Sequence, residues 1–520
     1  MLKNKKDIFL LVSVFMTGAA VLIIEILAMR IISPYFGNTI FTTSSVIGTV
    51  LTALSLGYYF GGRFSDKYPH YFVFYFIILV SGLLVVFMQF LTSFILPIFG
   101  TLFSMKSGPI ISSLFIFFIP AFVLGLLSPF AVKLHKKPSG SSQNTEGDQV
   151  GSQSGEVFFW STLGSIAGTL LAGFVLIPLF GINAIIIATG VFLFLWGAGG
   201  FFFLDSLKKH FSSLSYKYAL LPFLILAFVL LFVLFYWPQK TAGVIYQKDG
   251  VYEKIKIVDG EWNGSPTRFL FQDRSYSAAM YLQKNELVYD YTKYYTLYKL
   301  FNPNATKAFV IGGGAYSIPK ALLEESEDMQ VDVAEIEPDL LALSKKYFNF
   351  NPDNRLQDYT EDGRRFLSQN QKKYDILISD VYYSLFSIPM HFTTKEFFNL
   401  SKSRLEDNGV FIGNFGGNLY GDSSVLIMSE IKTFKEVFPN SYFFAVNSPK
   451  SQNIQNIIFL GINSNQKIDF NSNEIVKNNN TIINGLAQKN IKVDDIDFSQ
   501  YKELTDNFAP IEYLVGKIID

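Results

Sequence analysis

The sequence predicts two folds in one chain: an all-α transmembrane bundle over residues 1–237, followed by an α/β domain with a parallel sheet. Three observations support this prediction. Long apolar runs recur before residue 238, strand and helix patterns alternate after residue 300, and one apolar strand leads into Gly312, Gly313 and Gly314. A chain of 520 residues has room for more than one domain.

The composition excludes several classes of function. The formal net charge is +0, so the sequence gives no sign of a nucleic-acid partner. The chain has 0 Cys, which excludes disulfides, Cys-ligated zinc and thiol catalysis. With only 4 His, it also offers little for a His-based metal centre, and we expect no metal.

Seven apolar runs of about twenty residues occupy the N-terminal half, and each is long enough to cross a bilayer. They fall at 8–32, 39–61, 71–97, 109–132, 157–181, 183–205 and 216–237. We therefore expect a multi-pass protein of the cell membrane, with the lipid bilayer as a partner. The first run is too long for a signal peptide and lacks a small-residue cleavage site, so we expect it to remain uncleaved.

Two charged residues interrupt the first run. Glu25 and Arg30 lie inside it or at its end, where charges are costly and are usually paired. One interpretation is a substrate or ion pathway. The other is a structural ion pair near the membrane surface, with the long Arg30 side chain reaching the interface.

Residues 238–300 read as a linker, a small antiparallel β cap and a helix. Short alternating runs at 252–258 and 267–271 predict strands, and turn sequences follow at 259–260 and 263–264. Residues 286–301 are expected to be helical. The third domain then covers 301–520.

The glycine loop is the strongest motif of that third domain. The apolar strand at 307–311 enters it, a helix-compatible segment follows at 318–325, and a second apolar strand ends in Glu335. This is the layout of a nucleotide-binding βαβ unit, and it predicts a Rossmann-like domain of the methyltransferase type. The glycines let the backbone approach a ligand, and Glu335 can accept ribose hydroxyls.

Two more acids follow predicted strands. Asp362 precedes Gly363 after the third strand, and Asp380 follows the strand at 374–379. Because parallel strands end at one edge of a sheet, we expect Gly312, Glu335, Asp362 and Asp380 to converge on one crevice. There Asp362 could meet an adenine edge, and Asp380 could accept a proton from an attacking amine. Taken singly, each motif also has a structural interpretation, as a tight turn, a helix N-cap or a strand-end cap.

Over about residues 245–465 these motifs resemble the spermidine synthases, the polyamine aminopropyltransferases. The resemblance rests on the segments 311–314, 335–338, 362–366, 374–380 and 389–398. The whole layout resembles the membrane-fused form of that family. The resemblance implies decarboxylated S-adenosylmethionine as co-substrate, an amine as acceptor and no tightly bound cofactor.

The resemblance also implies roles for particular residues. Asp380 would be the proton acceptor, Glu335 would hold the ribose, Asp362 and Gly363 the adenine, and Pro389 would line the nucleoside pocket. Gly312, Gly313 and Gly314 would approach the nucleoside. A looser alignment brings Tyr252 and Asp290 near amine- and nucleoside-contacting positions.

The sequence departs from the family at the expected amine site. Ala315 and Tyr316 follow the triple glycine where the family has Asp-Gly, and Tyr383 stands where it has a second Asp. Both missing carboxylates would bind a diamine, whose two charges need fixed anions. Tyr383 could offer a cation–π face instead. The identity of the amine therefore stays open.

Two other functions remain open from the sequence. One is a methyltransferase that uses intact S-adenosylmethionine, and the other is a polyamine transporter or sensor with a degenerate synthase domain. Lysines in alternate loops predict a cytoplasmic amino terminus, so seven crossings would place the C-terminal domain outside, away from cytosolic nucleosides. A miscount at the short turn of Gly181 and Ile182 would resolve this conflict. The sequence is compatible with a homo-oligomer and does not decide the oligomeric state.

Overall fold

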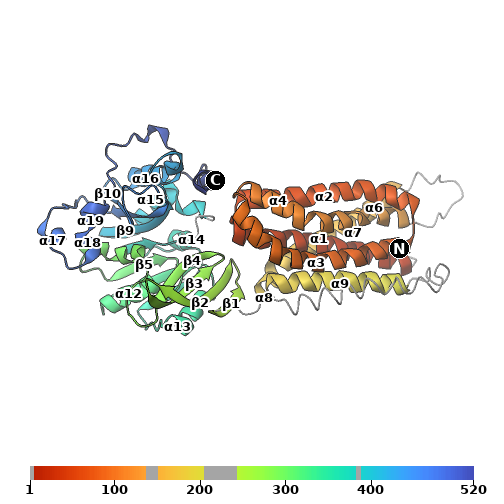
Figure 1. Ribbon diagram of the computed structural model, residues 1–520, viewed down its shortest axis with the longest axis horizontal. Helices are drawn as coiled ribbons and strands as arrows, with labels where there is room; N and C mark the ends of the chain where they lie inside the picture. The colour runs from red at the N-terminus through yellow and green to blue at the C-terminus, as the bar shows by residue number, and fades with distance from the viewer. Residues whose placement is uncertain (1–4, 136–149, 204–242, 382–387, 520) are drawn as a thin grey trace. The chain divides into compact units, whose positions relative to one another are not determined.

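The computed structural model describes residues 5–135, 150–203, 243–381 and 388–519 (Figure 1). The chain divides into two compact units, Met1–Thr241 and Ala242–Asp520. The predicted seventh run at 216–237 and the predicted site residue Tyr383 lie outside the described residues.

The first unit is a helical bundle. Within its described residues, five helices are long and apolar enough to cross a membrane, or six if one bent pair counts as a single span. The helices are α1 (Lys5–Phe36), α2 (Ile40–Lys67), α3 (Tyr71–Leu102), α4 (Ser107–Ile116), α5 (Phe118–Gly125), α6 (Leu127–Leu134), α7 (Val150–Leu171), η2 (Ala172–Leu176), α8 (Ile177–Leu179) and α9 (Ile182–Phe203).

The run at 109–132, predicted as one helix, is broken into α4, α5 and α6. The segments before and after Phe117 form the bent pair, with an angle of 51°. Pro120 and Pro129 explain the breaks, because a proline has no N–H to donate and its ring clashes with the carbonyl four residues earlier. Those carbonyls belong to Ile116 and Gly125, the last residues of α4 and α5. The next two runs are separate helices, as predicted, because α8 ends at Leu179 and α9 begins at Ile182.

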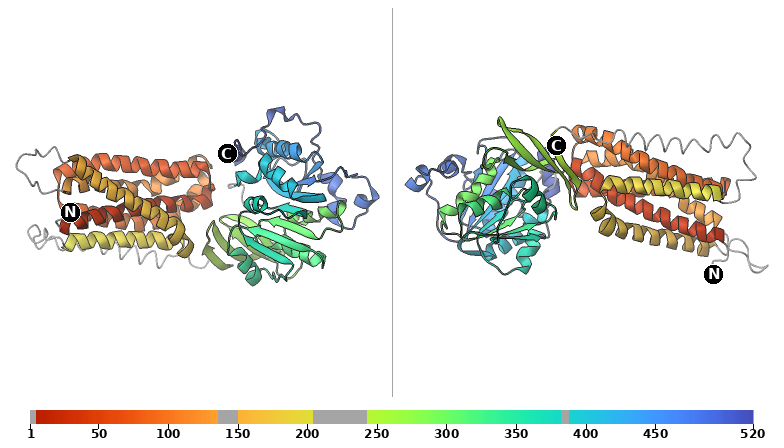
Figure 2. Two further views of the ribbon diagram at one scale, coloured as in Figure 1. Left: turned by 180° about the vertical axis from the view of Figure 1, so that it is seen from behind. Right: turned by 90° about the horizontal axis from the view of Figure 1, so that it is seen from below.

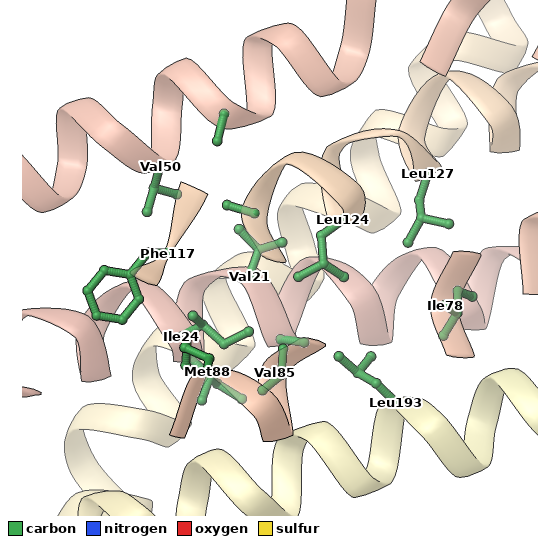
Figure 3. Close-up of a cluster of buried hydrophobic side chains, with 14 of the residues drawn as sticks. Val21, Ile24, Val50, Ile78, Val85, Met88, Phe117, Leu124, Leu127 and Leu193 are labelled. Atoms are coloured by element: carbon green, nitrogen blue, oxygen red, sulfur yellow. The ribbon is translucent and has the colours of Figure 1, made fainter. Parts of the chain in front are cut away.

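Glycines bring pairs of helices close together. A Cβ on Gly164 of α7 would lie 2.0 Å from the carbonyl oxygen of Phe15 in α1, and one on Gly82 of α3 would lie 2.3 Å from the amide nitrogen of Phe194 in α9. Such close backbone approach is typical of helix pairs in membranes. Figure 3 shows the apolar core at the centre of this bundle, with the labelled side chains Val21, Ile24, Val50, Ile78, Val85, Met88, Phe117, Leu124, Leu127 and Leu193.

The second unit starts with the predicted antiparallel cap. Four strands pair in chain order: β1 (Val244–Asp249), β2 (Lys254–Trp262), β3 (Ser265–Gln272) and β4 (Ser275–Tyr281). The helix expected at 286–301 is a 3₁₀ helix, η4 (Asp290–Leu300). In this helix the hydroxyls of Thr292 and Thr296 donate to the backbone carbonyls of Tyr289 and Lys293, three residues earlier. Such side-chain bonds compete with the backbone hydrogen bonds of an α-helix.

A seven-stranded sheet forms the rest of this unit, in the order β10-β11-β9-β8-β5-β6-β7. Its strands can be followed from two further sides in Figure 2, coloured green to blue. They are β5 (Lys307–Ile311), β6 (Gln330–Glu335), β7 (Leu356–Thr360), β8 (Tyr374–Ser379), β9 (Leu405–Gly417), β10 (Ser441–Ala445) and β11 (Gln455–Ile462). Counted from β5 in chain order, this is the 3-2-1-4-5-7-6 arrangement of methyltransferase-type folds, read from the other edge.

The sheet is mixed, whereas the sequence predicted parallel strands. β11 runs antiparallel to both β9 and β10. β9 also continues through the segment 407–409, whose residues Asp, Asn and Gly are typical of turns, as a bulge in which Asn408 has a φ of 64°. A bulge inserts a residue without ending the strand, so turn-forming residues alone do not distinguish the two.

Two apolar cores cover the two faces of the sheet. Along β5, Phe309 and Ile311 belong to one core, and Ala308 and Val310 to the other. The alternation follows from the two-residue period of a strand. The remaining helices are α12 (Ser317–Glu325), α13 (Leu340–Tyr347), α14 (Gly363–Gln369), η5 (Met390–Phe392), α15 (Lys395–Ser403), η6 (Asp422–Ser424), α16 (Val425–Val437), α17 (Asn473–Val476), α18 (Thr481–Asn484), α19 (Leu486–Lys489), η7 (Phe498–Gln500) and α20 (Ile511–Ile519).

Candidate active site

The site forms where the strand order reverses. β5 pairs with β6 on one side and with β8 on the other, so the crossovers leave β5 in opposite directions. Such a switch point opens a crevice at the carboxyl ends of the two central strands. The glycine loop follows β5, and Asp380 follows β8.

Gly312 makes the first turn of the loop and is in contact with the end of β8. Its φ is 88°, and a Cβ on it would lie 2.4 Å from the carbonyl oxygen of Asp380. Only glycine avoids both the strained backbone and the clash. The same observation shows that the backbones of Gly312 and Asp380 are neighbours.

Glu335 ends β6 and holds the loop in place. Its side chain is 6% exposed, and one carboxylate oxygen accepts from the amides of Gly313 at 2.7 Å and Gly314 at 3.1 Å. The other oxygen accepts from the amide of Glu337 at 2.9 Å. Burial raises the pKa of Glu335, and these three bonds oppose that rise. Since a carboxylate offers about four acceptor positions, room for one further donor remains.

Tyr316 closes the other side of the loop. Its φ is 58°, its side chain is fully buried, and its hydroxyl donates to Asp358. The ring stacks on Phe350 with centroids 5.1 Å apart. It also fills the place where a Cβ of Gly313 would stand, at 2.7 Å. Tyr316 therefore belongs to the core beneath the loop, and it explains why Gly313 is a glycine.

Asp380 is held by an amide chain from two neighbouring strands. Asn414 in β9 donates from Nδ2 to Oδ1 of Asp380 at 2.9 Å, and Asn456 in β11 donates to Oδ1 of Asn414 at 2.9 Å. The second bond fixes which atom of the Asn414 amide faces Asp380. Burial raises the pKa of Asp380 to about 6, while the hydrogen bonds from Asn414 and Tyr291 lower it.

A group of hydroxyls lies on the cap side of Asp380. Tyr291 in η4 approaches the carboxylate, and burial together with the charge of Asp380 raises the pKa of the phenol. Its ring stacks on Tyr289, and its hydroxyl lies 3.5 Å from the carbonyl of Ser277. In the part of the chain that the structure describes, the hydroxyls of Tyr289 and Ser277 are buried without a hydrogen-bond partner.

Asp362 follows β7, the strand that pairs with β6. It is the N-cap of α14, accepting from the amide of Arg365 at 2.9 Å, and its other oxygen lies 3.0 Å from Nε2 of His391. Burial raises its pKa, but the bonds from His391 and the backbone hold the pKa below its usual value. The N-cap interpretation is thus correct, and an adenine contact stays a prediction.

Gly363 and Pro389 lie near Asp362. A Cβ on Gly363 would lie 2.2 Å from Cγ2 of Ile311, so the glycine lets α14 pack against β5. Pro389 is half-buried just before η5, two residues from His391. The structure thereby brings the predicted Pro389 segment to Asp362.

The other predicted site residues are Tyr252, Asp290 and Tyr383, and each has different surroundings. The amide of Tyr252 donates to Glu337 at 2.9 Å, while half of its side chain is exposed. Asp290 turns to solvent and bonds Lys293 at 2.7 Å, so the structure does not bring it to the site. Tyr383 lies outside the described residues.

The sequence analysis missed three residues of the site, which are His391, Asn414 and Tyr291. His391 lies inside the segment 389–398 that carries the family resemblance, so that segment could have pointed to it. Asn414 lies within β9, where its side chain faces Asp380. Tyr291 carried no comparable signal, because the 3₁₀ geometry of η4 decides which side chain faces Asp380. Within the described residues no group of three or more His, Cys, Asp or Glu could hold a metal ion.

Fold and site together define an α/β domain with a nucleoside-type glycine loop beside a half-buried carboxylate. Residues 295–472 match the model of the spermine/spermidine synthase domain. This region includes the loop, Glu335, Asp362, Asp380 and Asn414, and it confirms the resemblance predicted from the motifs.

Curated relatives cover the same part of the chain. A polyamine aminopropyltransferase from Vibrio vulnificus is 29% identical over 167 residues, which is 32% of this chain and 54% of the relative. A thermospermine synthase from Arabidopsis thaliana is 24% identical over 208 residues, 39% of this chain and 59% of the relative. The chain thus spans about half the length of the curated relatives it matches. A solved structure of a probable spermidine synthase from Corynebacterium glutamicum aligns with a TM-score of 0.43 at 19% identity, covering 52% of this chain and 99% of that one.

Proposed function

We propose that the chain is a membrane-bound aminopropyltransferase, which moves an aminopropyl group from decarboxylated S-adenosylmethionine to an amine. The observation that carries the proposal is the contact between the end of β8, with Asp380, and the glycine loop held by Glu335. In this proposal the loop and Glu335 bind the nucleoside, and Asp362, Gly363 and Pro389 receive its adenine.

The transfer is a single displacement. The nitrogen lone pair of the acceptor attacks the propyl carbon next to the donor sulfonium, and the carbon–sulfur bond breaks. Its electrons return to sulfur, so methylthioadenosine leaves as a neutral thioether. Asp380 takes the proton that the nitrogen loses. A base with a pKa of about 6 is ionised at neutral pH, which suits this task.

The acceptor pocket we propose is lined by hydroxyls. Ala315, where the family has an acid, is 4% exposed and contributes no charge. Tyr291 instead offers a hydroxyl beside Asp380, and the buried hydroxyl groups of Ser277 and Tyr289 belong to residues that contact Tyr291. An amine with one charged end near Asp380 fits these groups better than a diamine that needs an anion at each end.

The helical unit would anchor the enzyme in the cell membrane with several crossings. Support comes from the five or six helices, among those described, that are long and apolar enough to span a bilayer. Protease accessibility of the C-terminal unit in intact cells and in inverted vesicles would determine its side of the membrane.

The test uses the purified full chain. We expect methylthioadenosine to form from the decarboxylated donor with at least one amine of a panel of mono- and diamines, measured by mass spectrometry. Asp380→Asn should reduce formation by about 100-fold or more. The matched control Asp290→Asn should not, because Asp290 is exposed. If no amine gives product, the proposal is wrong. Calorimetry that finds tighter binding of intact S-adenosylmethionine would point to a methyltransferase.

A further inference from the structure

The segment 503–508 lies beyond residues 295–472, the region that matches the family model. Within it, Thr505 and Phe508 exchange two backbone hydrogen bonds, at 3.0 and 2.9 Å, so Asp506 and Asn507 form the tip of a tight turn. About half of the Asp506 side chain is exposed. The family match assigns no role to this turn.

The turn is fixed to the α/β unit through its backbone. Leu504 is fully buried, its carbonyl accepts from the amide of Lys395 at 2.8 Å, and its amide donates to the hydroxyl of Thr433 at 2.8 Å. The amide of Asp506 donates to Glu396 at 3.0 Å. These bonds join the turn to the start of α15 and to α16, so they determine where the Asp506 carboxylate lies.

Asp506 forms a two-point ion pair with Arg364. Nη1 of Arg364 lies 2.7 Å from Oδ1 of Asp506, and Nη2 lies 2.5 Å from Oδ2. The hydroxyl of Thr394 also donates to Oδ1, at 2.8 Å. The hydrogen bonds from Arg364 lower the pKa of Asp506, so the carboxylate is charged at neutral pH. A planar guanidinium that is paired at two points is fixed in orientation as well as in position.

Arg364 connects this ion pair to the proposed nucleoside site. It lies in the first turn of α14, two residues after Asp362, and its side chain is 20% exposed. Besides pairing with Asp506, Nη1 of Arg364 donates to the backbone carbonyl of His391 at 2.9 Å. Nε2 of His391 in turn lies 3.0 Å from Oδ2 of Asp362. An unbroken chain of contacts therefore connects Asp506 to Asp362.

His391 needs this support because it stands in η5, a 3₁₀ helix of 3 residues. Its side chain is 43% exposed, so its neighbours cover little more than half of it. So short a helix leaves its carbonyls to partners outside it, and for His391 that partner is Arg364. Removing the charge that holds Arg364 therefore loosens the segment that presents the imidazole to Asp362.

We propose that Asp506 is a positioning residue for the nucleoside site, acting through Arg364 and His391. The inference rests on the proposed binding of adenine at Asp362. The carboxylate of Asp506 holds Arg364 against the carbonyl of His391. The imidazole then keeps Asp362 in the orientation in which the adenine meets it.

Nucleoside affinity and rate constants of the full chain test the proposal. Asp506→Asn keeps the size of the side chain and removes its charge, and calorimetry should show methylthioadenosine bound about fivefold more weakly. The KM for the decarboxylated donor should rise by about the same factor, while kcat stays the same because Asp380 is untouched. Asp506→Glu retains the charge and should restore most of the affinity. A residue that only stabilised the fold would not separate KM from kcat in this way.

A matched control lies in the same segment. Glu503 pairs with Lys395 at 2.6 Å, and Glu503→Gln should change nucleoside affinity by less than about twofold. Arg364→Gln should weaken binding as Asp506→Asn does. The double variant should lose no more than the larger single loss, because two residues that act in series share one effect.

The outcomes separate this inference from the proposed activity. If Asp506→Asn binds methylthioadenosine as tightly as the wild type, if Glu503→Gln loses as much, or if the two losses multiply in the double variant, Asp506 does not position the site. A wild type that binds nucleoside but gives no product with any amine overturns the transfer reaction and leaves the positioning role intact. A wild type that binds no nucleoside overturns both.

Discussion

Buried acids are treated in opposite ways in the two units of this chain. In the α/β unit, Glu335 receives three backbone amides, and Asp380 receives a side-chain amide that another amide orients. In the helical unit, Glu25 of α1 is 9% exposed and receives nothing from the described residues. The apolar surroundings are similar, so the difference lies in the supply of donors.

The difference follows from the two kinds of backbone. A helix uses nearly all its amides internally, so a side chain on α1 finds no free N–H. Strand ends and the loops after them leave amides unpaired, and Glu335 uses those of Gly313 and Gly314. The α/β unit can therefore supply a buried acid with hydrogen-bond donors before a ligand arrives, which is the preorganisation that catalysis needs.

The largest effect is expected at Asp380 itself. Removing a positioned base costs about 100- to 10,000-fold in rate, so Asp380→Asn should reduce product formation by this factor while nucleoside binding persists. The rate of the wild type should fall as pH drops below about 6, because the base becomes protonated. Rate measurements from pH 5 to 9, with binding by calorimetry, check both statements. If the variant loses nucleoside binding together with the rate, Asp380 does not act only as the base.

Asp380→Asn should also stabilise the fold at neutral pH. The folded pKa lies above that of an unfolded Asp, so the folded state binds the proton more tightly, and stability falls as pH rises from about 4 to 6. The neutral variant escapes this loss, with a gain of about 1–3 kcal/mol at pH 8. Denaturant unfolding of the full chain at pH 5 and 8 measures it. An equal change at both values of pH would contradict the linkage.

The glycine loop tests whether close approach, and not only backbone conformation, builds the site. Gly312→Ala adds a clash with the carbonyl of Asp380 to an unfavourable φ, and we expect a loss of about 3 kcal/mol or more. Gly264 has a φ of 72° and open space around it, so Gly264→Ala should cost only about 1 kcal/mol. Unfolding measurements on both variants separate strain from clash. Equal losses would remove the argument for contact between the two strand ends.

Asn414 and Asn456 form the amide chain to Asp380, and variants of both test how much these donors contribute. Asn414→Leu deletes a donor that lowers the pKa of Asp380, so the acidic limb of the rate profile should move to higher pH, by about one unit for a lost bond of about 1.4 kcal/mol. Asn456→Ala should move it less, because Asn456 acts only by orienting Asn414. A lower rate with an unmoved limb would indicate a packing role instead.

The smallest effect is expected at Asp362, where we propose that the adenine binds. Asp362→Asn keeps an N-cap acceptor but loses the charge that faces His391, and we expect about 1 kcal/mol or less of stability to be lost at pH 7. The depressed pKa of Asp362 means that this contribution is present above the unfolded pKa of about 4 and disappears as pH falls further. Glu503→Gln, which removes the ion pair with Lys395, is the control for nucleoside affinity. A large affinity loss in Asp362→Asn alone would support the adenine contact.

Much of this molecule could be read from local sequence. Apolar runs of sufficient length predicted the helices of the first unit, because length and hydropathy are properties of a contiguous segment. The strand, glycine loop and acid of the βαβ unit were also predicted, since each depends on residues close in the chain. The family motifs then pointed to Glu335, Asp362 and Asp380.

Tertiary structure decided the rest. That Tyr291 and not Asp290 approaches Asp380 depends on the 3₁₀ winding of η4, and that Asn414 reaches it depends on the order and register of β8, β9 and β11. The antiparallel direction of β11 and the missing partner of Glu25 are equally invisible in a single segment. The physical reason is that hydrogen bonds and burial join residues distant in sequence, so a side chain's partners are known only when the other strands and helices are in place.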